Sequence, residues 1–227
     1  MPLPCIEIET APHPQSSVIV LHGLGADGND FVPICEELNL GSWGSVRFIF
    51  PNAPERSVTI NGGYRMRAWY DILEPGLVRQ EDEAGLRASQ QLIARLIARE
   101  CERGVPAARI VLMGFSQGCA MALMTGLRYP ERLGALVGLS GYLPLAACTA
   151  AERSAANADL PIFLAHGRQD PVVQIARALA CRDELQRLGY APAWHEYGMQ
   201  HAVCPEEIVD LNRWLLATLD APGTQLD

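Results

Sequence analysis

The stretch Arg109–Leu127, RIVLMGFSQGCAMALMTGL, carries the clearest structural signal in the chain. The apolar run 110–113 has the length of a buried strand, and the segment 119–127 has the composition of a buried helix. Between them stands Gly114-Phe115-Ser116-Gln117-Gly118, which is G-x-S-x-G at a strand-to-helix turn. Two glycines permit a turn tight enough to expose the Ser116 hydroxyl on a strained backbone. We therefore predict a nucleophile elbow, and an ordinary buried strand-turn-helix is the alternative.

Strands and helices alternate along the rest of the chain. Apolar runs predict strands at residues 5–9, 17–22, 46–50, 110–113, 133–140, 161–166 and 193–197. Helical spacing and capping residues predict helices at about 29–40, 81–103, 117–127, 171–188 and 206–219. Residues 51–79 and 141–160 show no sustained period and are interpreted as irregular loops. This alternation predicts an α/β fold: one domain over residues 1–227, with a mostly parallel sheet, helices on both faces and no large cap domain.

Composition and charge exclude several classes of function. The chain has 227 residues and a net charge of −8, which argues against nucleic acid or an anionic membrane as a partner. All 18 basic residues are Arg, so chemistry that needs Lys, such as a Schiff base or a phosphate-binding P-loop, is excluded. We interpret the missing Lys as a coding bias, typical of a GC-rich bacterium, and not as part of a mechanism.

The cysteines and the N-terminal segment bear on the compartment. The seven cysteines are odd in number, are scattered and show no C-x-x-C, which favours free thiols in a reducing compartment. His and Cys show no metal-binding spacing, so we expect no metal and no cofactor. The N-terminus lacks the features of a signal peptide, and polar residues interrupt the one run long enough to span a membrane, residues 110–127. We therefore expect a cytoplasmic protein without an integral membrane segment.

Three polar residues follow predicted strands, where open α/β sheets place their functional sites: Ser116, Asp170 and His201. A serine hydroxyl becomes a good nucleophile only when a base takes its proton, and His has a suitable pKa near neutral pH. An acid behind the imidazole fixes its tautomer and stabilises the imidazolium. Serine, then acid, then histidine is the order that α/β-hydrolases use. These three residues are therefore the predicted catalytic triad.

Other histidines have simpler interpretations. His22 and His166 each end a predicted strand just before a glycine, where a role in holding the backbone or a neighbouring residue is expected. His195 lies inside the last predicted strand, whereas His201 lies in the loop after it. The alternative for Asp170 is a helix N-cap. Cys119 and Cys204 lie near Ser116 and His201 in sequence, but they are interpreted as inert thiols.

The loop His22–Asp30, HGLGADGND, follows a buried strand. It matches neither glycine-rich nucleotide-binding pattern, so we exclude nucleotides as ligands. Its small residues allow a backbone N–H, that of Leu24, to point into a site and bind an oxyanion. A plain tight turn is the alternative.

Several segments, taken together, resemble one family. They are LHGLGADGNDF (21–31), FPNAP (50–54), WYD (69–71), GFSQGCAMAL (114–123), HGRQDPVV (166–173) and GMQHAVCPEE (198–207). They resemble the bacterial carboxylesterase/acyl-protein thioesterase family, also called the phospholipase/carboxylesterase family, of the α/β-hydrolase fold. The resemblance covers nearly the whole chain and implies Ser116 as nucleophile, Asp170 as orienting acid and His201 as base. It also implies the backbone N–H groups of Leu24 and Gln117 as oxyanion donors.

The expected activity is hydrolysis of short- to medium-chain acyl esters, and of thioesters as well, through an acyl-enzyme intermediate. The expected partner is a small-molecule acyl substrate, and the expected assembly is a monomer or homodimer. An acyl-protein thioesterase, a lysophospholipase and, more remotely, a non-catalytic hydrolase-fold binding protein are alternatives. Core packing is an equal alternative for the aromatic residues among the substrate-contacting candidates, which are Trp69, Tyr70, Leu73, Phe115 and Val172.

Overall fold

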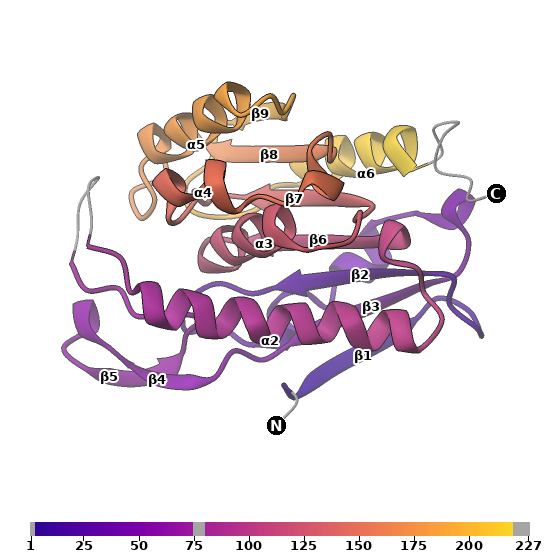
Figure 1. Cartoon of the computed structure of the whole chain (residues 1–227), viewed down its shortest axis with the longest axis horizontal. Coiled ribbons are helices and arrows are strands. Elements are labelled where there is room, and N and C mark those ends of the chain that lie inside the picture. Colours follow the sequence, from indigo (N-terminus) through magenta and orange to yellow (C-terminus); the bar gives the residue numbers. More distant parts are fainter. Residues whose placement is uncertain (1–2, 75–79, 220–227) are drawn as a thin grey trace.

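A seven-stranded sheet runs through the centre of the molecule (Figure 1), in the order β1-β3-β2-β6-β7-β8-β9. The computed structural model describes residues 3–74 and 80–219. The strands are β1 (Cys5–Glu9), β2 (Ser16–Leu21), β3 (Val46–Pro51), β6 (Ile110–Phe115), β7 (Ala135–Leu139), β8 (Ile162–Gly167) and β9 (Ala193–Tyr197). Strand β1 pairs antiparallel with β3, and every other neighbouring pair of this sheet is parallel. This is the mostly parallel sheet that the sequence predicts.

Helices cover both faces of the sheet, and each face has its own apolar core. The helices are α1 (Ile34–Glu37), α2 (Glu83–Glu102), α3 (Gln117–Arg128), α4 (Ala146–Glu152), α5 (Ile175–Arg187) and α6 (Pro205–Leu219). Apolar residues of α2, α3 and α5 form one core with one face of the strands, and those of α1 and α6 form the second core with the other face. Figure 1 shows α2 and α3 in front of the sheet, with α6 behind it. The central strands are therefore buried on both sides, which explains their continuous apolar sequences.

Two segments that were expected to be irregular contain regular structure. Residues 51–79 include a two-stranded antiparallel hairpin, β4 (Glu55–Val58) and β5 (Tyr64–Arg67), and residues 141–160 include α4. The helix expected at residues 29–40 is wrong in form: a 3-10 turn, η1 (Gly28–Phe31), is followed by the single turn of α1. Pro33 lies between the two, and a proline cannot donate the backbone hydrogen bond that a continuous helix requires there.

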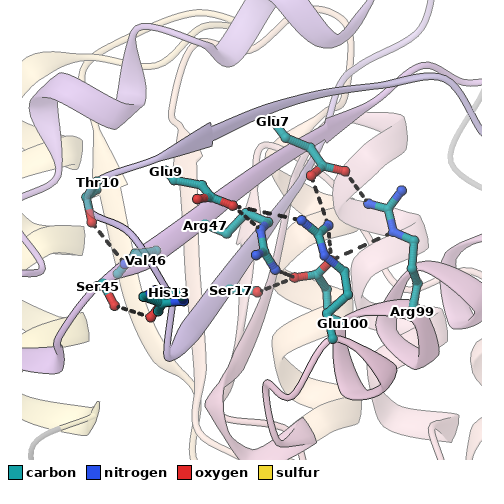
Figure 2. A network of polar contacts seen from close by, with 11 residues as sticks. Glu7, Glu9, Thr10, His13, Ser17, Ser45, Val46, Arg47, Arg99 and Glu100 are labelled. Carbon is teal, nitrogen blue, oxygen red and sulfur yellow. Dashed lines mark hydrogen bonds and ion pairs between the residues drawn. The ribbon is translucent and has the colours of Figure 1, made fainter.

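A buried polar network fastens the sheet to helix α2 near the amino ends of β2 and β3 (Figure 2). Glu100 is fully buried and accepts hydrogen bonds from Ser17 Oγ (2.7 Å), Arg47 Nη1 (2.6 Å) and Arg103 Nη1 (2.9 Å). Arg47 also reaches Glu9 of the edge strand β1, with Nε 2.9 Å from Oε1. The contacts of this carboxylate offset the cost of removing it from water.

Candidate active site

Ser116 lies at the junction of β6 and α3, the predicted elbow. Its backbone has φ 56° and ψ −116°, a conformation that L-residues rarely adopt. The elbow is tight because side chains are missing on either side: a Cβ on Gly114 would overlap the Gly118 carbonyl, and a Cβ on Gly118 would overlap the Leu21 carbonyl oxygen. Gly114 therefore lets the first turn of α3 pack directly against β6, and Gly118 lets the same turn pack against the end of β2.

The structure brings Ser116, His201 and Asp170 into one hydrogen-bonded chain. The distance from Ser116 Oγ to His201 Nε2 is 2.9 Å, and that from His201 Nδ1 to Asp170 Oδ2 is 2.6 Å. Because a carboxylate only accepts, His201 Nδ1 carries the proton, which leaves Nε2 of the neutral ring able to accept the serine proton. The Asp170 side chain is fully buried, whereas the His201 side chain is 16% exposed, so solvent reaches the histidine of this chain and not its acid.

The loops that carry the acid and the histidine are joined to each other. Arg168 N donates to the Tyr197 carbonyl (2.9 Å) and Gln169 N donates to the Met199 carbonyl (3.1 Å), which extends the pairing of β8 with β9. A Cβ on Gly167 would overlap the carbonyl oxygens of Met199 and Gln200. This close approach, which sequence reasoning did not find, fixes the separation of Asp170 and His201.

The loop after β2 lies directly beside the elbow. A Cβ on Gly23 would be 3.4 Å from Ser116 Cβ, so the backbone that leads into Leu24 is close to the serine. His22 Nδ1 lies 2.7 Å from the Gly23 carbonyl, and its Nε2 accepts from Ala53 N at 3.0 Å. Burial lowers the pKa of His22, which keeps the ring neutral and able to make both contacts. These two contacts agree with the expected role of His22 in holding the backbone.

Gln117 combines two positions that matter to the site. Its backbone N–H belongs to the first residue of α3, and its side chain crosses to the segment before α2. There Gln117 Oε1 accepts from Trp69 N (2.8 Å) and its Nε2 donates to the Tyr70 carbonyl (2.7 Å). Sequence reasoning missed this tie, because no motif reports a contact between residues 48 positions apart.

The two aromatic residues of the WYD motif lie inside the protein. Trp69 is fully buried and donates from Nε1 to the His22 carbonyl at 2.9 Å. Tyr70 is buried as well, with its hydroxyl 2.6 Å from that of Tyr142. Of the two interpretations open for this pair, the structure favours core packing behind the site over direct contact with a substrate.

The other substrate-contacting candidates are more accessible. Phe115 is half-buried, and its ring centroid lies 4.7 Å from that of His201. Val172 is 58% exposed and follows Asp170 by two residues, while Leu73 is half-buried beside Tyr70 and Tyr142. Phe115 and Val172 are therefore available to a ligand near the triad.

The described part of the chain also bears on metals and membranes. Residues 3–74 and 80–219 contain no group of three or more His, Cys, Asp or Glu side chains placed to hold a metal ion. Over the same ranges, no helix has both the length and the apolar character needed to cross a bilayer.

Comparison with known proteins gives one consistent result. The model of the phospholipase/carboxylesterase family matches residues 3–219. Acyl-protein thioesterase 1 of Yarrowia lipolytica is 40% identical over 219 residues, which cover 94% of this chain and 96% of the relative. Acyl-protein thioesterase 1 homolog 1 of Dictyostelium discoideum is 37% identical over 217 residues, which cover 94% of this chain and 95% of the relative.

Solved structures agree in fold. Acyl-protein thioesterase 2 of Zea mays superposes with a TM-score of 0.82 at 30% identity, over 94% of this chain and 99% of that one. SOBER1 of Arabidopsis thaliana superposes with a TM-score of 0.85 at 27% identity, over 90% of this chain and 99% of that one. Together with the family match, these superpositions confirm the α/β-hydrolase fold predicted from the sequence.

Proposed function

Because the chain belongs to the phospholipase/carboxylesterase family, we propose that it hydrolyses short- to medium-chain acyl esters, and thioesters as well, through an acyl-enzyme formed on Ser116. The activity class is that of a carboxylic ester hydrolase. The observation that carries the proposed mechanism is the unbroken hydrogen-bonded chain from Ser116 Oγ through His201 to Asp170.

In the first half-reaction, Ser116 Oγ attacks the substrate carbonyl carbon while His201 Nε2 takes the hydroxyl proton. Asp170 stabilises the resulting imidazolium through Nδ1–H. The backbone N–H groups of Leu24 and Gln117 bind the oxyanion of the tetrahedral intermediate, and the N-terminus of α3 adds its positive dipole end there. When the intermediate collapses, His201 protonates a departing alcohol; a thiol instead leaves as thiolate, and His201 then releases its proton to solvent, so that Nε2 is free in either case.

In the second half-reaction, water attacks the acyl carbonyl and gives one proton to His201 Nε2. The second tetrahedral intermediate breaks to the free acid, and Ser116 recovers its proton from His201. Leu73, Phe115 and Val172 are the proposed contacts for the substrate, with Trp69 and Tyr70 supporting them from the core.

A rate series on p-nitrophenyl esters from acetate to palmitate tests this proposal. We expect kcat/KM to peak at short to medium chains and the activity to be lost in Ser116→Ala with the fold retained. Removal of an essential triad member costs about 10⁶-fold in kcat in the worked serine-protease example. Equal hydrolysis by the wild type and the Ser116→Ala variant would contradict the proposed nucleophile.

Acyl-protein thioesterase activity is the second candidate, and the names of the relatives favour it. A rise of kcat/KM toward palmitate, together with hydrolysis of a palmitoylated cysteine peptide, would favour this candidate over a short-chain esterase. A cytoplasmic location is proposed on the grounds that all seven cysteines are free thiols. A bacterial source stays a prediction from the missing Lys, because the relatives named above are eukaryotic.

A further inference from the structure

A second histidine lies against the proposed catalytic acid. His166 belongs to β8 and is fully buried, with its Nε2 2.8 Å from the Val173 carbonyl and 3.4 Å from Asp170 Oδ2. Both neighbours are acceptors, so Nε2 carries the ring proton, which it donates to the Val173 carbonyl while lying close to the Asp170 carboxylate. Asp170 Oδ2 therefore faces two imidazoles, that of His201 at 2.6 Å and that of His166.

These contacts close a ring around the acid. Asp170 Oδ1 accepts from Val172 N (2.8 Å) and Val173 N (2.9 Å), while the Val173 carbonyl faces His166. The backbone of Val173 is thus held twice: its N–H donates to Asp170, and its carbonyl accepts from His166. His166 itself lies in the register of the sheet, opposite Glu196 of β9. This ring of contacts therefore ties the carboxylate of Asp170, which lies on a loop, to His166 on strand β8, which the sheet holds in place.

The surroundings of Nδ1, the other ring nitrogen, indicate that the hydrogen bond from Nε2–H is the contact for which a histidine is needed at position 166. Nδ1 is buried and has no hydrogen-bond partner among the residues that the structure describes. A buried polar atom without a partner costs about 1–3 kcal/mol, and an apolar side chain of similar size would avoid that cost. Burial also lowers the pKa of His166, so the ring is neutral and adds no charge beside the triad.

We propose that His166 is a positioning residue, which holds the segment Gly167–Val173 so that Asp170 stays aligned with His201. This inference rests on the proposed roles of Ser116, Asp170 and His201. It assigns His166 no contact with substrate. It predicts that a change at His166 alters turnover only through Asp170.

The test compares kcat and KM for a p-nitrophenyl ester in the intact protein. We expect His166→Phe to lower kcat by about 10- to 100-fold, the range found when an orienting hydrogen bond behind a metal ligand is lost, with KM changed less than about 2-fold. His166→Gln keeps an N–H donor and should recover most of that loss. His166→Asn is polar but too short to reach Val173, so it should lose activity as His166→Phe does.

A double-mutant cycle separates positioning from general structural damage. Asp170→Asn alone should lower kcat by about 10⁴-fold, and adding His166→Phe to it should change kcat by less than about 3-fold, because no carboxylate remains to be aligned. His195→Phe is the matched control: this histidine on neighbouring β9 lies 3.7 Å from another carboxylate, that of Asp210, and should keep the wild-type kcat.

Two results would overturn the inference. One is a wild-type kcat in folded His166→Phe or His166→Asn, with folding checked by thermal unfolding. The other is a 10- to 100-fold loss from His166→Phe that persists in the Asp170→Asn background. Failure of the proposed function would be distinct, because the unaltered protein would then show no hydrolysis that depends on Ser116.

Discussion

Ser116 shows how far one backbone conformation depends on the absence of neighbouring side chains. A residue held at φ 56° and ψ −116° carries strain of about 1–3 kcal/mol, which persists only where the surrounding structure enforces it. Gly114 and Gly118 make that enforcement possible, because backbone contacts on both sides of the serine leave no room for a Cβ. The reactivity proposed for Ser116 thus belongs to the turn as much as to the hydroxyl.

Gly118→Ala tests this dependence. Its Cβ would overlap the Leu21 carbonyl oxygen, so α3 must shift relative to β2. A displacement of order 1 Å at a catalytic group costs about 10²-fold in rate, and we expect a loss of kcat/KM of at least that size. The control is Gly41→Ala, where the added Cβ would meet only the Asn39 side chain at 3.4 Å and activity should be unchanged. Wild-type turnover in Gly118→Ala would mean that the tight elbow is not needed.

The sequence predicts which residues form the candidate triad, but it does not predict the contacts that hold them in place. Ser116, Asp170 and His201 follow strands, and the carboxyl ends of parallel strands meet at one edge. The ring through His166 and the tie from Gln117 to residues 69 and 70 depend on which strands are neighbours, and the spacing of residues along the chain does not encode that order.

Among the elements, the strands of the central sheet are predicted within two residues of their ends, and this includes β7, which lies inside the run 133–140. Continuous apolar runs such as 17–22 are typical of parallel strands buried on both faces, because such strands tolerate few polar residues. The hairpin β4–β5 escaped prediction for the opposite reason. Its sequences, ERSV and YRMR, are short and polar, and Tyr64 is 71% exposed. An exposed hairpin therefore shows neither alternation nor an apolar run.

Helix α6 begins with a pair of glutamates in different surroundings. Glu206 is exposed, whereas Glu207 is fully buried. Burial disfavours the charged form and raises the pKa of Glu207 from 4.5 to about 8. The native protein therefore keeps a proton that the unfolded chain loses at lower pH.

The contribution of Glu207 to stability should consequently fall as the pH rises from about 5 to about 8. In this window its carboxyl binds more protons in the native state than in the unfolded state, so it adds a negative term to the pH slope of the free energy of unfolding. Glu207→Gln, which is neutral throughout, should remove that term and make the slope more positive, while Glu206→Gln should leave the slope as in the wild type. Urea midpoints at pH 5, 6, 7 and 8 measure both effects. An unchanged slope in Glu207→Gln would contradict a protonated carboxyl at this position.

Across the whole molecule, the two ends of the sheet carry different polar groups. The candidate active site lies at the carboxyl ends of β6, β8 and β9, where Ser116, Asp170 and His201 follow their strands. The network around Glu100 lies at the other end, against Ser17 near the start of β2 and Arg47 near the start of β3 (Figure 2). The length of the strands separates the two sets of groups, so stability and turnover should respond to different substitutions.

Glu100→Ala should therefore lower stability without lowering activity. The substitution leaves the buried Arg47 with Glu9 as its remaining carboxylate partner and removes an acceptor from Ser17. Breaking a buried ion pair on one side costs about 3 kcal/mol, whereas its distance from the elbow should leave kcat and KM of the folded protein unchanged. Denaturant unfolding and ester hydrolysis below the unfolding transition measure the two quantities separately.

The matched control for this prediction is Glu83→Ala at the other end of the same helix. Glu83 makes an exposed pair with Arg87, which keeps a second carboxylate partner in Glu152, so its loss should cost no more than about 0.5 kcal/mol. A cost for Glu100→Ala as small as that for Glu83→Ala would show that Ser17 and Arg47 find other partners. A fall in kcat of folded Glu100→Ala would instead show that the amino ends of the strands influence the geometry of the elbow.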